Sequence, residues 1–281
     1  MPPRLFRFLP KPAATFLEAK KIWFSNILDF NDPFDATPSF TEITDQSYQS
    51  LGRKTFGRQS IAGELQQRIE QDKAEAVPIL TRFFQERFSE CFGVVCFTAR
   101  NDWVPMWARY ASNHEGFAVE FNPEHPLFSN ENFGVVHYGP KRPQLALATS
   151  GLEQELRKLA FTKSDQWIDE AEWRLVKGWR DLKEAVKPWD KKGGRYVDLP
   201  PEIVRAIYFG CRVTRQVTDE IEACCKRPEY RDVKLFQMRP DPADYKLIEA
   251  PWTGHKTEIP DGERSILQAL WRQSSAGYDV P

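Results

Sequence analysis

The sequence predicts an α+β fold, in which a single domain has a mixed, mostly antiparallel sheet of about eight to ten short strands flanked by helices. Short apolar runs bounded by turn-forming residues recur along the chain, and they are interspersed with segments whose apolar residues lie three or four positions apart. The 281 residues contain no internal repeat and no clear linker. One core is therefore expected, around a sheet that can also be split in two.

Four features organise the first third of the chain. Leu5–Phe8 and Ile22–Ser25 are expected to form short strands. The turn formers of Asn31–Asp35 can hydrogen-bond neighbouring backbone amides, which predicts a rigid loop. From Ser60 to Phe88 apolar residues recur at about every fourth position, which predicts two helices, or one helix broken at Pro78. These helices form an insertion near residues 60–90.

The rest of the chain is richer in strands. Phe117–Phe121 alternates in a way that places Glu120 on the outer, solvated face. Further strands are expected at Phe92–Phe97, Phe133–Tyr138, Glu172–Lys177, Tyr196–Leu199, Val204–Phe209, Val233–Phe236 and Tyr245–Ile248. Helices are expected between Pro105 and Gly116, after a capping Ser150, and over Thr214–Lys226. Residues 1–252 would form the domain, and residues 253–281 a peripheral tail or helix.

Charge and cysteine content narrow the class of protein. The net charge is −1, so no overall field draws the chain to nucleic acid or to a membrane. The five cysteines have no regular spacing, which favours reduced thiols over a secreted disulfide framework. No stretch approaches the length of a membrane span, and the amino-terminal segment lacks the apolar core of a signal peptide. We therefore expect a cytoplasmic protein without a membrane partner.

The most informative segment contains two alternating carboxylates, Glu170 and Glu172, between Trp167 and Trp173. Burying a carboxylate in apolar surroundings costs free energy unless a cation or a hydrogen-bond donor contacts it. Lys163 and Arg174 are the nearest cations in the sequence. The segment is therefore either a candidate active site or a salt-bridged strand edge.

Residues 174–195 form a basic stretch with interleaved tryptophans, a combination that suits a phosphate backbone with exposed bases. The candidate nucleic-acid contacts in it are Arg180, Lys187, Lys191 and Lys192. The alternative is a solvated loop whose tryptophans cover the core. Oligomeric state is not predicted by any pattern in the sequence.

Common catalytic motifs are absent. The chain has no G-x-G-x-x-G, no phosphate-binding P-loop, no G-x-S-x-G and no Cys-x-x-Cys, and its four histidines are scattered. We therefore expect no metal. Asp165, Glu172 and Arg174 leave open a metal-dependent nuclease. Trp103, Trp107 and Tyr110, together with the basic stretch, leave open a non-catalytic module that recognises nucleic acid or peptide.

Four stretches resemble a known family: LFRF near the start, IWFSNILDFNDPFD, PMWARYASNHEGFAVEF and KSDQWIDEAEWRLV, with weaker likeness in IYFGCRVT and the late YKL. On these stretches the chain is identified as a member of the bacterial domain-of-unknown-function 2971 family. That family name implies no reaction.

The order of features is also similar to the arginine–serine–glutamate layout of ADP-ribosyltransferases, with Arg7 on a first strand, Ser25 ending a second, and Glu170-x-Glu172 opening a later one. This resemblance implies an enzyme that cleaves the nicotinamide–ribose bond of NAD, its substrate, and transfers ADP-ribose to a nucleic-acid or protein acceptor. With water as the acceptor it would be an NAD glycohydrolase. A bacterial toxin or a phage-defence protein is the context it suggests.

The resemblance also implies roles for individual residues. Glu172 would stabilise the oxocarbenium-like ribose, as carboxylates do in glycoside hydrolysis, and Glu170 would orient the acceptor. Arg7 would hold the NAD phosphates, and Ser25 would orient the ribose. Phe34 or Tyr110 would stack on the nicotinamide ring.

Overall fold

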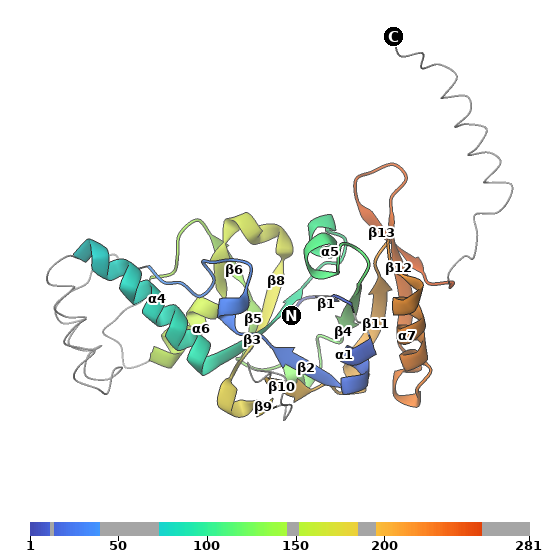
Figure 1. Ribbon diagram of the computed structural model, residues 1–281, viewed down its shortest axis with the longest axis horizontal. Coiled ribbons are helices and arrows are strands. Elements are labelled where there is room, and N and C mark those ends of the chain that lie inside the picture. Colours follow the sequence, from blue (N-terminus) through green and yellow to red (C-terminus); the bar gives the residue numbers. More distant parts are fainter. Residues whose placement is uncertain (12–13, 40–72, 145–151, 185–194, 255–281) are drawn as a thin grey trace, which may run out of the picture.

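The computed structural model describes residues 1–11, 14–39, 73–144, 152–184 and 195–254 (Figure 1). Its largest element is an 8-stranded sheet. In order across the sheet, the strands are β13 (Leu247–Pro251), β12 (Lys234–Pro240), β11 (Val204–Phe209), β4 (Phe117–Phe121), β1 (Leu5–Leu9), β3 (Phe92–Thr98), β8 (Glu172–Gly178) and β5 (Phe133–Val135). Within this sheet β11 and β12 run parallel, and the other neighbours are antiparallel. The predicted mixed, mostly antiparallel architecture is confirmed.

Two smaller sheets accompany it. One joins β2 (Lys21–Phe24), β10 (Arg195–Asp198) and β9 (Lys183–Glu184), and the other pairs β6 (His137–Gly139) with β7 (Thr162–Ser164). The sequence-predicted strand Phe133–Tyr138 is thus divided between β5 and β6. These small sheets bring segments far apart in the chain together, since β2 and β10 are separated by most of the sequence.

The large sheet opens between two of its interior strands, β1 and β3. They share a single ladder partner, Phe6 with Thr98, whereas β1 and β4 are paired along all of β1. The other end of β3 is bridged by Ser25, which follows β2, through a reciprocal pair of backbone hydrogen bonds with Val94 of 2.9 and 3.0 Å. The chain therefore passes from β2 across β3 where β1 has diverged, and this leaves a space between the two strands.

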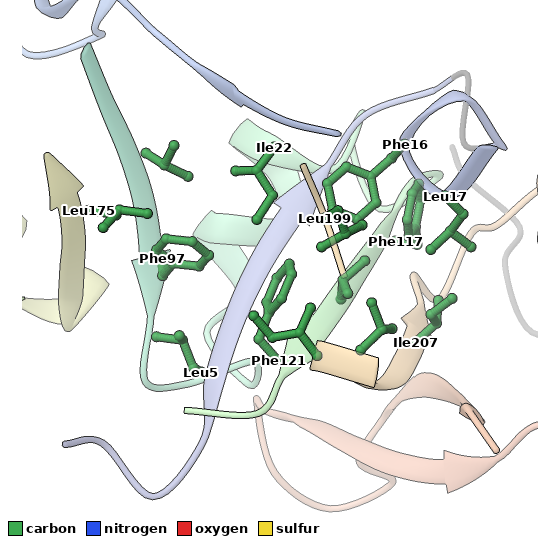
Figure 2. Close-up of a cluster of buried hydrophobic side chains, with 14 of the residues drawn as sticks. Leu5, Phe16, Leu17, Ile22, Phe97, Phe117, Phe121, Leu175, Leu199 and Ile207 are labelled. Atoms are coloured by element: carbon green, nitrogen blue, oxygen red, sulfur yellow. The ribbon is translucent and has the colours of Figure 1, made fainter. Parts of the chain in front are cut away.

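Helices pack on both sides of the sheet and form three apolar clusters. The largest joins α1 (Ala14–Ala19) and α7 (Arg215–Cys225) to the inner side chains of β1, β3, β4 and β11. Figure 2 shows part of this cluster, in which Phe97 and Phe121 of the large sheet lie near Ile22 of the three-stranded sheet. A second cluster joins α4 (Lys73–Cys91) and α6 (Leu152–Ala160) to β3 and β8. In the third, α5 (Val104–Tyr110) packs against β1, β4 and β11.

Most predicted elements are present within one to four residues of their expected ends, and two details of the prediction are wrong. Helix α4 continues through Pro78 in the described residues, because the proline removes only one backbone N–H donor from the helix. Glu120 is 8% exposed rather than solvated, because Arg4 and Tyr208 bind its carboxylate at 3.0 and 2.7 Å.

Some predictions concern residues outside the described ranges. They are the part of the helical insertion at 60–72, the capping Ser150 and the tail at 255–281. Among the helices that are described, none has both the length and the apolar character needed to cross a membrane.

Leu5→Ala should destabilise the protein by about 2–5 kcal/mol, because Leu5 is fully buried on a central strand and its truncation leaves a cavity. Leu28→Ala is the matched control, since Leu28 is 51% exposed, and its cost should stay below about 1 kcal/mol. Urea unfolding of the three proteins gives both values. Equal losses for the two variants would contradict the position of β1 in the core.

Candidate functional site

A cavity of about 440 Å³ occupies the opening between β1 and β3. Its walls come from β1, β3, the loop that follows β2, α5, and the segment that leads into β8. Five residues singled out from the sequence line this one cavity: Arg7, Ser25, Tyr110, Glu170 and Glu172. They are contributed by four separate parts of the chain, so their convergence is a property of the tertiary structure.

The innermost group is Arg174, whose side chain is fully buried beside the cavity. Its guanidinium donates to both oxygens of Asp35, at 2.8 and 3.1 Å, and to both oxygens of Glu172, at 2.7 and 3.0 Å. A further hydrogen bond of 2.8 Å reaches the carbonyl oxygen of Ala160. Arg174 thus ties the loop after β2, the end of α6 and the start of β8 together, with every contact charge-assisted.

Lys163 connects the two glutamates. Its ammonium donates to Oε2 of Glu170 at 2.8 Å and to Oε2 of Glu172 at 2.9 Å. Between the glutamates Ala171 adopts a left-handed conformation (φ 45°), in which the chain leaves the short helix Asp165–Glu170 and enters β8. This unfavourable conformation for alanine is offset by the shared cation, and it lets both carboxylates reach one ammonium.

The outer side of Glu170 faces α5. Tyr110 donates its hydroxyl to Oε1 of Glu170 at 3.0 Å, and Arg109 lies 3.6 Å from the same oxygen. The Arg109 guanidinium also lies over the rings of Trp103 and Trp167, 5.7 and 5.0 Å from their centroids. Because Arg109 is 44% exposed, this aromatic and cationic group forms the rim of the cavity.

Burial and charge set the protonation states in the network. Burial alone would raise the pKa of Glu172, but Arg174 and Lys163 lower it to about 2, so the carboxylate is ionised at neutral pH. Burial would lower the pKa of Lys163, yet the facing carboxylates hold it well above its usual range. Burial also raises the pKa of Tyr110 to about 12, with a contribution from Glu170, so its hydroxyl stays a donor.

Two polar atoms in the cavity wall lack partners. The NH1 atom of Arg7 and the Oδ2 atom of Asp32 are both hidden from solvent, and neither is hydrogen-bonded within the described residues. The other terminal nitrogen of Arg7 reaches the carbonyl oxygen of Trp23 at 3.4 Å. Burial lowers the pKa of Arg7 to about 10, which still leaves it charged at neutral pH. Both atoms therefore have an unused capacity to bind.

Several residues proposed from the sequence lie elsewhere. Phe34 is 53% exposed, lines a second, smaller cavity of about 250 Å³, and lies against Arg142 rather than in the main cavity. Asp165 is exposed and does not line the main cavity. Trp107 is fully buried and donates to the carbonyl oxygen of Asn101, so it offers no recognition surface. The nuclease and recognition alternatives stay predictions.

The described part of the basic stretch begins at Arg174 within β8 and continues past the far end of that strand. Arg174 belongs to the buried network, and Trp179 donates to the carbonyl oxygen of Ser89 from a half-buried position. Arg180 is exposed, and the length of β8 places it about 20 Å from Glu172. Lys187, Lys191 and Lys192 lie outside the described residues. Their role as nucleic-acid contacts stays a prediction.

Sequence reasoning identified Lys163 and Arg174 as the cations that meet the glutamates, and the geometry confirms this. It missed three lining residues. Asp35 was interpreted as a turn former, but it is the buried partner of Arg174. Asp32 was also interpreted as a turn former, and the sequence does not show that its side chain is buried. Cys96 lies beside Glu172 on β3, where burial and that carboxylate raise its pKa well above the usual range. A single cysteine within an apolar run carries no signal of that position.

The described residues contain no group of three or more His, Cys, Asp or Glu side chains arranged to hold a metal ion. The carboxylates that gather at this site are ion-paired with Lys163 and Arg174.

Residues 106–175 match the family described as "Protein of unknown function (DUF2971)". The resemblance noted in the sequence is confirmed over this segment. The matched segment runs from α5 to β8 and includes Tyr110, Lys163, Glu170 and Glu172. Arg7 and Ser25 precede it in the chain and lie outside the match. No curated protein and no solved structure matches the chain.

Arg174→Met should destabilise the protein by about 3–5 kcal/mol, because it leaves the carboxylates of Asp35 and Glu172 buried with too few cations. Arg180→Met, on the same segment but exposed, should change stability by less than about 0.5 kcal/mol. Urea unfolding followed by circular dichroism measures both. Similar values for the two variants would show that Arg174 does not hold the network together.

Stability should fall at acid pH because of Glu172. The folded pKa of Glu172 is about 2 against an ordinary value of 4.5, so its contribution is present above pH 4.5 and is lost as pH falls towards 2. The shift corresponds to about 3 kcal/mol. Burial raises the pKa of Asp35, which partly offsets the loss. Unfolding free energies at pH 7, 4 and 3 should therefore fall more steeply in the wild type than in Glu172→Gln, and parallel curves would contradict this assignment.

Proposed function

We propose that this protein is an ADP-ribosyltransferase-like enzyme that cleaves the nicotinamide–ribose bond of NAD and transfers ADP-ribose to a nucleic-acid or protein acceptor. One observation carries the proposal. Arg7, Ser25, Glu170 and Glu172, which were identified by their order in the sequence, line the same cavity. Its volume of about 440 Å³ is within the range of sites that bind small molecules and cofactors.

The charge of the network suits this chemistry. Cleavage of the bond between ribose and nicotinamide develops positive charge on the ribose. Three buried carboxylates (Asp35, Glu170 and Glu172) face two buried cations (Lys163 and Arg174), so the buried network carries one net negative charge. Because Glu172 is ionised and its orientation is set by Arg174, it offers a preorganised negative charge to the transition state.

Glu170 and its neighbours would handle the acceptor. Glu170 is nearer to the rim than Arg174, and Tyr110 and Arg109 contact its outer oxygen. A carboxylate in that position can orient an attacking hydroxyl or accept its proton. If water takes this place, the same site hydrolyses NAD without labelling an acceptor.

Arg7 and Ser25 would hold the dinucleotide. Arg7 lines the cavity and its Nη1 has no hydrogen-bond partner in the described structure, so its guanidinium would suit a phosphate oxygen. Ser25 is exposed and its backbone is held by Val94, and its hydroxyl would orient the ribose. Tyr110 lines the same cavity and is the better placed of the two aromatic candidates for the nicotinamide ring.

The cellular role follows from the chemistry. An enzyme that consumes NAD or modifies a macromolecule harms the cell that contains it, which suits a bacterial toxin or a phage-defence protein. All five cysteines are free, which agrees with a cytoplasmic setting. A nucleic-acid acceptor reaching the site would involve Arg180, Lys187, Lys191 and Lys192, and a protein acceptor would not need them.

Purified protein incubated with NAD, with and without RNA, DNA and protein fractions, should release free nicotinamide. Glu172→Gln should lower the rate at least about 100-fold, because it removes the charge that faces the ribose. Glu131→Gln, an exposed glutamate outside the cavity, is the matched control and should retain full activity. Circular dichroism confirms that each variant is folded. Absence of nicotinamide release by the wild type under every condition would refute the proposed function.

A further inference from the structure

Asp32 lines the cavity and has one buried carboxylate oxygen without a hydrogen-bond partner in the described structure. The residue is 4% exposed, and its two oxygens differ in their surroundings. Oδ1 accepts the backbone N–H of Phe34 at 2.9 Å, which closes the turn of the loop after β2. Oδ2 is hidden from solvent and has no hydrogen-bond partner in the part of the chain that the structure describes. Asp32 lines the same cavity as Arg7 and the glutamates.

The turn alone does not explain an aspartate at this position. Asparagine closes such turns equally well through its own Oδ1, and it brings no negative charge into the interior. A buried carboxylate oxygen without a donor destabilises the folded protein. Asp35, three residues later, is also buried, but both of its oxygens are bound by Arg174. The unused charge of Asp32 therefore points to a group that arrives with a ligand.

The distribution of charge around the cavity indicates which group that is. The loop after β2 contributes Asp29, Asp32 and Asp35 to the wall, whereas β1 contributes the Arg7 guanidinium with its free NH1. No ion pair joins Arg7 to Asp32 in the described structure, so each is available to a different part of one ligand. That ligand should carry an anionic oxygen at one end and a cationic or N–H-donating group at the other.

We propose that Asp32 binds the nicotinamide end of NAD and selects the oxidised dinucleotide. This inference rests on the proposed function. The free Oδ2 accepts a hydrogen bond from the carboxamide NH₂, and its charge attracts the positive pyridinium ring, while Arg7 holds the phosphates. NADH lacks the ring charge, and the deamidated dinucleotide carries a carboxylate that Asp32 repels. Because cleavage turns the pyridinium into neutral nicotinamide, the attraction weakens in the product and favours its release.

Binding of three dinucleotides tests the proposal directly. Calorimetry with NAD, NADH and nicotinic acid adenine dinucleotide, in the slowed Glu172→Gln background, gives their relative affinities. With Asp32 present, NAD should bind at least about 10-fold more tightly than either analogue, as expected for a buried hydrogen bond to a charged group. Asp32→Asn, which keeps the turn through Oδ1, should bring the three affinities within about 3-fold of one another.

Asp219→Asn is the control, because it removes the same charge from an exposed position on α7, outside the cavity. It should leave the affinity ratios within about 2-fold of their starting values, since solvent screens this carboxylate. In steady-state assays of the otherwise wild-type enzyme, Asp32→Asn should raise KM for NAD without lowering kcat in proportion, because the charge contact is lost as the product forms.

The possible failures are distinguishable. If the wild type neither binds nor cleaves NAD, the proposed function fails. Suppose instead that the wild type cleaves NAD. If the Glu172→Gln protein that retains Asp32 then binds all three dinucleotides equally, or if adding Asp32→Asn leaves the preference for NAD unchanged, only the role of Asp32 is overturned. Should Asp32→Asn not fold, the affinity ratios of the protein that retains Asp32 still decide the question.

Discussion

The buried guanidinium of Arg174 is the group on which the rest of the site depends. It lies between Asp35 and Glu172 and also reaches the end of α6, so it joins the distant loop after β2 to the neighbouring segments α6 and β8. Buried ion pairs contribute little net stability compared with apolar residues of the same volume, because desolvation offsets their attraction. Here the ion pairs of Arg174 fix the positions of the segments that they join. The loop that carries Asp32 is held against β8, and Glu172 is held in one orientation.

The opening of the large sheet is the second constraint. Because β1 and β3 share one ladder partner, Phe6 with Thr98, the sheet separates between these two interior strands and leaves room for a ligand. The bridge from Ser25 to Val94 covers the part of β3 that β1 leaves. A cavity built in this way has a strand on each side, with Arg7 on one and Cys96 on the other, and apolar clusters keep both strands rigid.

Charge inside the cavity is balanced only in part. Lys163 and Arg174 satisfy the glutamates and Asp35, whereas Arg7 and Asp32 each keep one unpaired polar atom among the described residues. Paired groups define the shape of the site, and unpaired groups are available to a ligand. An interior that leaves a donor and an acceptor unmatched is unfavourable without one, and for that reason the two atoms are the most informative features of the cavity.

Local patterns in the sequence were sufficient to predict most of the strands, the helices near Pro105 and Thr214, and the meeting of Glu170 and Glu172 with Lys163 and Arg174, because these depend on periodicity and on near neighbours. The tertiary structure alone decided that Asp35 pairs with Arg174, 139 residues away, that Phe34 lies outside the cavity, and that Glu120 is buried. Composition and spacing do not specify which strands become neighbours. Burial of a polar side chain depends on those neighbours, and so does its chemistry.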